Sequence, residues 1–520
     1  MPSKSSAAPV AAASGAPAST PLLAALVFLT GGVILVLEIV GARLISPVYG
    51  SSLNVWSSLI TVTLLALAIG YETGGRLADR FPSHDTLQRL LGVAGVFILV
   101  VPSLRQPVLR ATAPLGLQAG ALVASAILLM VPLVLLSAAG LVVARAATRS
   151  LERLGRGVGR VSFYSTLGSV AGALATGFFL IPRFPVSRIF YGAGVAVIAG
   201  MALVALDRRR TGTASVQAFA AVVAGAVLFT SPEPLKRHAI FQTQTFYGEI
   251  EVLESYPVRY LMLDGIHQSI WDAQKAENAG TYIHALEYGA LASGGDRALV
   301  IGVGAGALPV ILERHYGMVA DSVDINARVV ETAREYFGFA TKGRTYVEDG
   351  RTFIQRAADA SYDLVVLDTF NGDAIPYHLL TKEFFAQVAR VLRPSGVVAV
   401  NAVGLSHGKG GLSSDARAVA ATLRTALPRV RAFGLMAPDE AVRDPALENV
   451  VFFASRAEIG AGAPSTWREA ARHVLGPMAK QEIAEGAMDG GLVLTDDYNP
   501  IDFLNAPTAR VWRARILEAS

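Results

Sequence analysis

Three acidic residues in the C-terminal half of the sequence follow apolar stretches and could bind or deprotonate a ligand. Asp324 lies near the end of ADSVDIN, Asp349 lies in VEDGRTF, and Asp368 lies in YDLVVLDTF. A carboxylate at the end of a buried strand can accept hydrogen bonds from ribose hydroxyls or from the exocyclic amine of an adenine. It can also bind a cationic amine and remove its proton. We therefore predict that Asp324 and Asp349 bind a nucleoside and that Asp368 is a general base.

A glycine-rich turn precedes Asp324 and supports the nucleoside hypothesis. In LVIGVGAGALPVILE an apolar run leads into Gly302, Gly304 and Gly306, and a helical pattern follows. Glycines at such a turn let backbone N–H groups approach a ligand where a Cβ would obstruct it. Asp324 ends the next apolar run, 22 positions after Gly302, as expected of an acid that binds ribose hydroxyls. The order of elements indicates nucleoside binding, and a purely structural turn is the alternative.

Each acid also has a structural interpretation. Asp349 is followed by Gly350, and an Asp-Gly pair is common in turns. Asp368 could cap a helix instead of acting as a base. Asp363 precedes the same strand as Asp368, and we expect it to be a solvated turn residue.

Composition excludes several other kinds of site. The chain has no cysteine, which excludes disulfides, thiolate metal sites and a cysteine nucleophile. Its eight histidines, among them His267, His284 and His378, show no metal-ligand spacing, so we predict no metal site. The formal net charge is only +4, without a long basic run, and nucleic acid is therefore not an expected partner.

The elements that would position these acids are predicted from residue 298 onward. Continuous apolar stretches such as GVVAVNAVG alternate with amphipathic stretches such as ARVVETAREYF and KEFFAQVARVL. This alternation predicts an α/β doubly wound domain with a parallel sheet covered on both faces and a ligand beyond the strands' carboxyl ends. Upstream, YGEIEVLES and VRYLMLDG alternate apolar and polar residues, as half-buried antiparallel strands do.

The N-terminal half is predicted to form an α-helical transmembrane bundle. The chain is 52% hydrophobic and 17% charged, with a mean hydropathy of +0.45. Each apolar segment approaches or exceeds the roughly 20 residues that cross about 30 Å of hydrocarbon. The segments lie near 22–45, 53–75, 87–103, 117–144, 161–181, 186–206 and 214–230. We therefore predict six or seven helices; the seventh is the weakest because it is short and alanine-rich.

Two local features of the bundle have more than one interpretation. Gly168 and Gly172 are four positions apart in LGSVAGALATG, a spacing that lets two helices approach closely in lipid; small residues scattered by composition are the alternative. Glu38 lies in the first apolar segment, five positions before Arg43. Because a charge in a membrane span is costly, we expect a Glu38–Arg43 pair or an interhelical pair, and a role in a substrate path is the alternative.

Basic residues between the segments predict the orientation of the bundle. One side carries Lys4, Arg76, Arg80, Arg89, Arg145, Arg149, Arg153, Arg156, Arg160, Arg208, Arg209 and Arg210. The other carries Arg43, Arg105, Arg110, Arg183, Arg188, Lys236 and Arg237. The excess on the first side places the N-terminus inside, and seven spans would then place everything after residue 231 outside. If the short segment 214–230 does not cross, six spans leave the C-terminal half inside, and we favour this arrangement because the nucleoside ligand predicted above would be found in the cytoplasm.

The C-terminal half resembles the polyamine aminopropyltransferases, or spermidine synthases, in the form fused to a multi-pass membrane domain. The resemblance covers about residues 235–505. It rests on YLMLDGIHQS, TYIHALEYGAL, VIGVGAGALPVILE, VDINARVVETAREYF, VEDGRTF, YDLVVLDTF and LTDDYNPID, and in the membrane half on LEIVGARLISPVYGSS and YETGGRLADR. It implies a class I S-adenosylmethionine-type Rossmann-like domain. It also implies transfer of an aminopropyl group from decarboxylated S-adenosylmethionine, a co-substrate, to an amine such as putrescine, releasing methylthioadenosine.

The resemblance implies a role for individual residues. Asp324 would hold the ribose, Asp349 and Gly350 the adenine, and Asp368 would be the general base for the acceptor. The implied amine-binding residues are Gln268, Tyr282, Asn371 and Asp373.

The sequence also departs from the family pattern at several positions. Ala305 stands where the family has the acid that binds the donor's ammonium group. His284 stands where the family has a glutamate, Asn371 stands at the second acid of an Asp-x-x-Asp pattern with Asp373 close by, and Gly248 replaces an adenosine-contacting glutamine.

The predicted organisation is a disordered tail (1–20), a transmembrane domain (21–230), a β-strand subdomain (231–297) and a Rossmann-like domain (298–520). The predicted function is a transferase in the cell membrane whose partners are a small amine and the lipid bilayer; the sequence leaves a homo-oligomer open. A methyltransferase that uses S-adenosylmethionine is the second hypothesis, because Gly-x-Gly-x-Gly without the acid also fits that superfamily. A membrane transporter or polyamine sensor without catalysis is the third.

Overall fold

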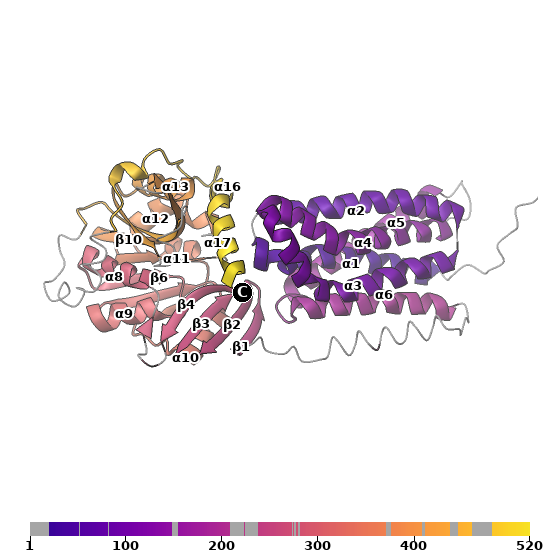
Figure 1. Ribbon diagram of the computed structural model, residues 1–520, viewed down its shortest axis with the longest axis horizontal. Helices are drawn as coiled ribbons and strands as arrows, with labels where there is room; N and C mark the ends of the chain where they lie inside the picture. Colours follow the sequence, from indigo (N-terminus) through magenta and orange to yellow (C-terminus); the bar gives the residue numbers. More distant parts are fainter. Residues whose placement is uncertain are drawn as a thin grey trace, which may run out of the picture.

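The computed structural model consists of a bundle of long helices next to an α/β half (Figure 1). We use "α/β half" for everything from residue 238 onward. The structure describes residues 20–50, 53–81, 83–147, 154–207, 223, 238–272, 274, 277–278, 281–370, 376–407, 411–436, 446–459 and 481–519. Helices and strands below keep the labels of Figure 1.

Six helices of the described chain are long and apolar enough to cross a membrane. They are α1 (Thr20–Tyr49), α2 (Leu53–Arg80), α3 (His84–Thr112), α4 (Leu117–Ala147), α5 (Leu154–Ala175) and α6 (Val186–Asp207). They correspond to the first six predicted segments, so that part of the prediction is confirmed. The seventh predicted segment, 214–230, and the predicted tail lie outside the described residues, apart from Thr20 and Val223.

Small residues bring α1 and α5 into close contact. A Cβ added to Gly168 would lie 2.0 Å from the carbonyl oxygen of Phe28, and one added to Gly172 would lie 2.4 Å from that of Gly32. The Ser169 hydroxyl donates to the carbonyl of Gly31 across the same contact, at 3.1 Å. Gly168 and Gly172 therefore have a packing role between helices, and composition alone does not explain their spacing.

Helix α6 runs antiparallel to α3, and its contacts show at which end of the bundle it stops. Gly200 of α6 packs against Leu26 and Leu29 near the start of α1, and Gly92 of α3 packs against Met201. α6 therefore ends where α1 begins. The α/β half lies at the other end, where Arg43 of α1 contacts it. This arrangement differs from the one expected with six spans, in which the α/β half would lie at the end of the bundle where α6 stops.

A small antiparallel sheet begins the α/β half. Its strand order is β1-β2-β3-β4-β5, and its strands are β1 (Ala239–Thr245), β2 (Gly248–Ser255), β3 (Val258–Leu263), β4 (Ile266–Asp272) and β5 (Glu277–Asn278). Asp264 and Gly265 join β3 to β4 with positive φ angles of 48° and 79°. The Asp-Gly sequence suits this turn, because both residue types tolerate left-handed backbone better than most.

The large sheet has the order β12-β13-β10-β9-β6-β7-β8, with β11 paired to β10. Strands β10, β9, β6, β7 and β8 are parallel, and β13 and β12 are antiparallel to their neighbours. The strands are β6 (Arg297–Ile301), β7 (Val319–Asp324), β8 (Thr345–Val347), β9 (Tyr362–Leu367), β10 (Leu392–His407), β11 (Gly411–Leu412), β12 (Arg429–Met436) and β13 (Ala446–Ser455).

Helices cover both faces of the large sheet. The central strands are apolar on both faces: Val300 and Val366 pack under α8 and α9, whereas Ile301 and Leu367 pack under α11, α12 and α13. The helices of this half are α8 (Thr281–Ser293), α9 (Ala307–Tyr316), α10 (Ala327–Phe337), α11 (Gly350–Arg356), α12 (Lys382–Val391), α13 (Ser414–Arg424), α16 (Ile501–Leu504) and α17 (Ala506–Ala519).

The predicted fold class, a helical bundle followed by a Rossmann-like α/β fold with a small β-sheet, is confirmed by this architecture. The chain order reverses between β6 and β9, since β7 and β8 lie to one side and β9 and β10 to the other. Ligands of doubly wound sheets bind at such a switch point, beyond the carboxyl ends of the strands.

The arrangement of the bundle predicts that Ser83, between α2 and α3, and Ala358, after α11, lie on opposite sides of a membrane. Because the chain has no cysteine, Ser83→Cys and Ala358→Cys each introduce a single thiol. A membrane-impermeant maleimide applied to intact cells should label one variant and not the other, and permeabilised cells should label both. Equal labelling of the two variants in intact cells would contradict the arrangement.

Candidate functional site

A cavity of about 300 Å³ lies at the switch point, between the carboxyl ends of β6, β7 and β9 and the small sheet. The three predicted acids Asp324, Asp349 and Asp368 all line it. The predicted Gly302, Gly304 and Gly350 line it with Gln268 and Tyr282, whereas Gly306 is not among the lining residues. Asn371 and Asp373, the other predicted amine-binding residues, lie outside the described residues.

The glycine turn after β6 lets two strand ends approach each other. Gly302 has a φ of 95°, and a Cβ there would lie 2.0 Å from the carbonyl oxygen of Asp368. The Asp368 N–H donates to the carbonyl of Ile301 at 2.9 Å. A Cβ at Gly306 would lie 2.4 Å from the ring of Phe339. Glycine is thus required both for the backbone conformation and for space.

Asp324 lies at the end of β7 with both carboxylate oxygens facing backbone donors. Its Oδ2 accepts from the N–H of Val303 at 2.9 Å, and its Oδ1 accepts from the N–H of Asn326 at 2.8 Å. Burial raises the pKa of Asp324, and these two N–H donors partly oppose the rise. Each oxygen keeps a second lone pair for a hydroxyl in the cavity. Asp324 therefore both fixes the glycine turn and can accept hydrogen bonds from a ribose.

Asp349 is the N-cap of α11 and also pairs with a histidine. Its Oδ1 accepts from the N–H of Thr352 at 2.9 Å, and its Oδ2 lies 2.9 Å from Nε2 of His378. Burial alone would raise the pKa of Asp349, but the donors Thr352 and His378 lower it overall. Asp349 thus caps a helix, as its structural interpretation supposed. It also lines the cavity, where an adenine amine could reach it.

Asp368 follows β9 and is held by an amide side chain. Nδ2 of Asn401, on β10, donates to Oδ1 of Asp368 at 2.8 Å. Nδ2 of Asn449 donates in turn to Oδ1 of Asn401 at 3.1 Å, which fixes the orientation of that amide. Burial raises the pKa of Asp368 to about 6, although the Asn401 donor lowers it. A carboxylate with such a pKa can exchange a proton with an amine near neutral pH.

Tyr282 and Gln268 line the cavity together with Asp368. The Tyr282 hydroxyl donates to the backbone carbonyl of Gln268 at 3.0 Å. Burial and the charge of Asp368 raise the pKa of Tyr282, so it stays a neutral donor. The hydroxyl oxygen of Ser269 accepts from the N–H of Ala305 at 3.2 Å, which joins the small sheet to the glycine turn.

Sequence reasoning missed several lining residues. Asp264 and Tyr247 come from turns of the small sheet, and Glu348 comes from a loop of the large one. Asn401 is 1% exposed, and one signal for it was available: it is a lone polar residue within GVVAVNAVG.

Asp363 and His284 both lie away from the cavity and are held by contacts within the protein. Asp363 is not solvated; it is 6% exposed and accepts from the N–H groups of Asp296 and Arg297 and from the guanidinium of Arg393. It therefore joins the starts of β6, β9 and β10 instead of facing water. His284 does not line the cavity; its Nδ1 lies 2.7 Å from Oε1 of the buried Glu287.

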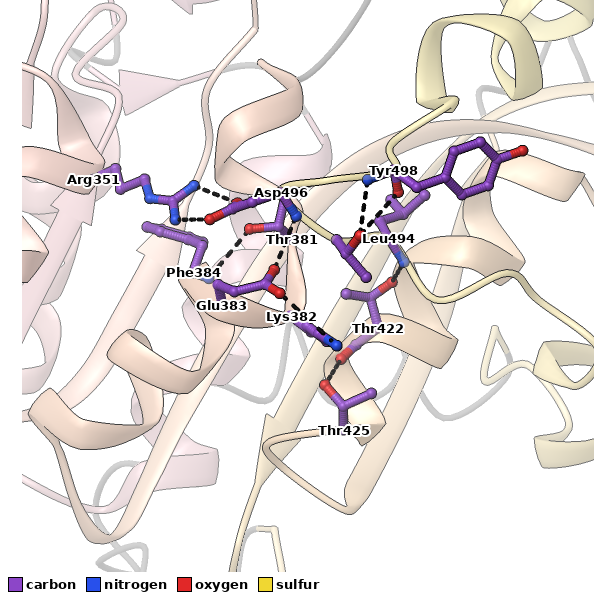
Figure 2. A network of polar contacts seen from close by, with 11 residues as sticks. Arg351, Thr381, Lys382, Glu383, Phe384, Thr422, Thr425, Leu494, Asp496 and Tyr498 are labelled. Atoms are coloured by element: carbon purple, nitrogen blue, oxygen red, sulfur yellow. Dashed lines mark hydrogen bonds and ion pairs between the residues drawn. The ribbon is translucent and has the colours of Figure 1, made fainter.

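The C-terminal segment is attached to the cavity wall by an ion pair. Figure 2 shows the guanidinium of Arg351, on α11, facing Asp496, with both pairs of atoms at hydrogen-bond distance, 2.7 and 2.5 Å. The same Arg351 donates to the carbonyl of His378 at 3.1 Å. The N–H of Asp496 donates to Glu383 at 3.0 Å. LTDDYNPID thus stabilises the loop that carries His378.

Within the described chain, no group of three or more His, Asp or Glu side chains is arranged to hold a metal ion. The lining of the cavity has a different character. Its described residues include the five carboxyl side chains of Asp264, Asp324, Glu348, Asp349 and Asp368 and neither lysine nor arginine. Such a cavity suits a cationic ligand with hydroxyl and amine groups.

Residues 288–408 match the family model of the spermine/spermidine synthase domain. The polyamine aminopropyltransferase of Vibrio vulnificus is 39% identical over 111 residues, which cover 20% of this chain and 37% of that protein. The N-terminal histidine N-methyltransferase of Emericella nidulans is 34% identical over 182 residues, which cover 34% of this chain and 31% of that protein. The chain thus spans less than half of the length of these curated relatives. The family match confirms the resemblance predicted from the sequence.

Among solved structures, a probable spermidine synthase from Corynebacterium glutamicum is similar to this chain with a TM-score of 0.40 and 20% identity. The similarity covers 51% of this chain and 97% of that one.

The geometry around Asp324 predicts its contribution to nucleoside binding. Asp324→Ala should weaken the binding of methylthioadenosine by about 1–3 kcal/mol, because buried ribose hydroxyls lose a charged acceptor. Asp324→Asn keeps one acceptor oxygen and should lose less. Isothermal calorimetry on the full-length protein in detergent measures both, with the exposed Asp359→Asn as a control. Equal affinity of Asp324→Ala and the unmodified protein would remove Asp324 from the binding site.

Proposed function

We propose, from the spermine/spermidine synthase domain that this chain carries, that it is a membrane-attached transferase acting on amines. It would move an aminopropyl group from decarboxylated S-adenosylmethionine to a small amine such as putrescine and release methylthioadenosine. The donor is a co-substrate, not a tightly bound cofactor.

The charge of the cavity is the observation that carries this proposal. Its described lining holds five carboxyl groups without a lysine or arginine. A decarboxylated donor brings a sulfonium and an ammonium group, and the acceptor brings at least one more ammonium group, so these charges complement the lining. Intact S-adenosylmethionine adds a carboxylate, for which the described lining offers no lysine or arginine.

The proposed reaction is a displacement at carbon. The neutral amine nitrogen attacks the donor's methylene carbon next to the sulfonium; a C–N bond forms, the C–S bond breaks, and its electron pair leaves with sulfur as a neutral thioether. Asp368 takes the proton that the nitrogen must lose, and Asn401 holds the carboxylate in place at 2.8 Å. Tyr282 and the carbonyl of Gln268 position the amine beside Asp368.

The nucleoside would bind at the end of the cavity that carries Asp324 and Asp349, away from the amine end at Asp368. Asp324 would accept hydrogen bonds from the ribose hydroxyls, and Asp349 with Gly350 would contact the adenine. Gly302, Gly304 and Gly306 would keep the backbone close to the donor's sulfur-bearing arm. Asn371 and Asp373 would complete the amine end, as the resemblance implies.

A methyltransferase is the second candidate, and two observations favour it. Ala305 supplies no carboxylate for the donor's ammonium group, a loss that leaves a desolvated charge poorly compensated. A stretch of 182 residues is similar to an N-terminal histidine N-methyltransferase. The two candidates release different products, because methyl transfer leaves S-adenosylhomocysteine and aminopropyl transfer leaves methylthioadenosine.

The proposal includes the side of the membrane on which the α/β half lies. We place the α/β half on the cytoplasmic face, since adenosyl donors are cytoplasmic, and the lipid bilayer around the bundle is then its anchor. The count of basic residues favours the opposite face, because the arginine-rich loops lie at the bundle end away from the α/β half. Labelling of Ala358→Cys in intact cells would rule out a cytoplasmic donor.

Product analysis by mass spectrometry tests the function. Full-length protein incubated with the decarboxylated donor and a panel of amines should release methylthioadenosine, and Asp368→Asn should lower turnover about 10²-fold or more because an amide cannot take the proton. Methylthioadenosine binding should be retained in that variant. Release of S-adenosylhomocysteine from the intact donor would favour the methyltransferase, and nucleoside binding without turnover would favour a sensor or transporter.

The pH dependence of turnover tests the role of Asp368 separately. Because the pKa of Asp368 is raised to about 6, the carboxyl is protonated below that pH and cannot act as a base. kcat/KM should therefore rise with pH through about 6. Asn401→Leu removes the donor that stabilises the carboxylate, so the midpoint should move to higher pH. An unchanged midpoint in Asn401→Leu would separate Asp368 from the rate-determining proton transfer.

A further inference from the structure

A helix of the membrane bundle contacts the turn that forms one wall of the cavity. Nη1 of Arg43, in α1, donates to the carbonyl of Thr245 at 2.9 Å, and Nη2 donates to the carbonyl of Phe246. These carbonyls belong to the turn between β1 and β2, which we call the β1–β2 turn (residues 245–248). Its Tyr247 lines the cavity. The sequence had suggested Glu38 as a partner of Arg43, but among the described contacts Arg43 pairs with this turn.

The β1–β2 turn is linked to the proposed ribose acceptor by buried hydrogen bonds. Nδ2 of Asn326 donates to the Thr245 hydroxyl oxygen at 3.1 Å, and the N–H of Asn326 donates to Oδ1 of Asp324 at 2.8 Å. Thr245 and Asn326 are each 6% exposed, so water does not replace these contacts easily. A continuous path of hydrogen bonds therefore runs from Arg43 through Thr245 and Asn326 to Asp324.

The residue that follows this turn, Glu249, also fixes a second acid of the cavity. The Glu249 N–H donates to Oδ1 of Asp264 at 2.8 Å. A Cβ at Gly248, whose φ is 138°, would lie 2.6 Å from Oδ2 of Asp264. Burial raises the pKa of Asp264, and the nearby charges of Arg43 and Arg105 lower it. The two arginines come from α1 and α3, so the bundle influences the charge of the cavity as well as its shape.

We propose that Arg43 is a positioning residue for the nucleoside end of the cavity, so that the membrane bundle forms part of the donor site. Arg43 does not line the cavity; it holds the β1–β2 turn, whose Thr245 holds Asn326 and whose next residue, Glu249, holds Asp264. The nucleoside end is affected and the amine end is not, because the path from Arg43 ends at Asp324 while Asp368 is held independently by Asn401 on β10. The kinetic part of this inference rests on the proposed transferase function; the binding part rests only on the proposed nucleoside site.

Arg183 offers a matched control. Its Nη1 donates to the carbonyls of Phe178 and Phe179, each at 3.4 Å, within the bundle. Arg183→Gln thus removes an arginine that contacts two backbone carbonyls without touching the β1–β2 turn. Arg43→Lys is the conservative variant, since an ammonium keeps the charge but cannot reproduce the two-donor fork of a guanidinium.

The experiment uses full-length protein in lipid nanodiscs and methylthioadenosine as the probe. Arg43→Gln should raise the Kd for methylthioadenosine roughly tenfold, Arg43→Lys should raise it less, and Arg183→Gln should leave it unchanged. With turnover, Arg43→Gln should raise KM for the donor while KM for the amine and kcat stay near their original values. A purely structural lesion would lower kcat and the thermal midpoint without this split.

A double-variant cycle tests the path itself. Thr245→Val removes the hydroxyl that accepts from Asn326 but keeps the carbonyl that Arg43 contacts, so its effect on Kd and that of Arg43→Gln should be less than additive. An unchanged Kd in folded Arg43→Gln would overturn the inference and leave Arg43 as a tether. If no amine is converted by the unmodified protein, the proposed function fails, but the Kd series still decides the role of Arg43.

Discussion

The close approach of Gly302 to Asp368 determines the geometry of the site. A Cβ at position 302 would lie 2.0 Å from the Asp368 carbonyl oxygen, and any other side chain would push β6 and β9 apart at their carboxyl ends. Because the two strands touch there, the glycine turn and the acid of β9 face the same cavity. The turn is completed from β7, where Asp324 accepts the N–H of Val303. The arrangement of the carboxyl ends of β6, β7 and β9 thus depends on Gly302, which lacks a side chain.

The second constraint is electrostatic. Five carboxyl groups line one cavity, and each would repel the others if all were charged without partners. Asp349 is stabilised as the anion by Thr352 and His378, and its pKa is lowered. Burial raises the pKa values of Asp264, Asp324 and Asp368. A cationic ligand would favour the charged forms, so binding and proton release are coupled in this cavity.

The bundle is built around α1, which packs on α4, α5 and α6. Its glycines allow the close contact with α5, and Arg43 at its other end contacts the α/β half. An arginine at a bundle end has to satisfy several N–H donors, and backbone carbonyls of a turn can accept from them without adding an opposite charge. One helix therefore supports the packing of the bundle and the shape of the cavity.

Local sequence patterns were sufficient for the elements and for part of the site. Segment length and hydropathy predicted six helices, and continuous apolar strands alternating with amphipathic helices predicted the doubly wound sheet, because both signals depend on neighbours within one element. The glycine turn, Asp324, Asp349 and Asp368 were found because acids and glycines at strand ends share one edge of a parallel sheet.

Tertiary structure decided what depends on residues far apart in the chain. Asp363 looked like a turn residue, and only folding brings the starts of β6 and β10, with Asp296 and Arg393, next to it. Asn401 became the partner of Asp368 because β10 lies beside β9. Arg43 was paired with Glu38 from its spacing, whereas its contacts lie in a turn some 200 residues later. The sequence determined which residues can act and on which elements they lie; the packing of those elements decided which residues meet, because a contact between distant segments leaves no periodic signal in either one.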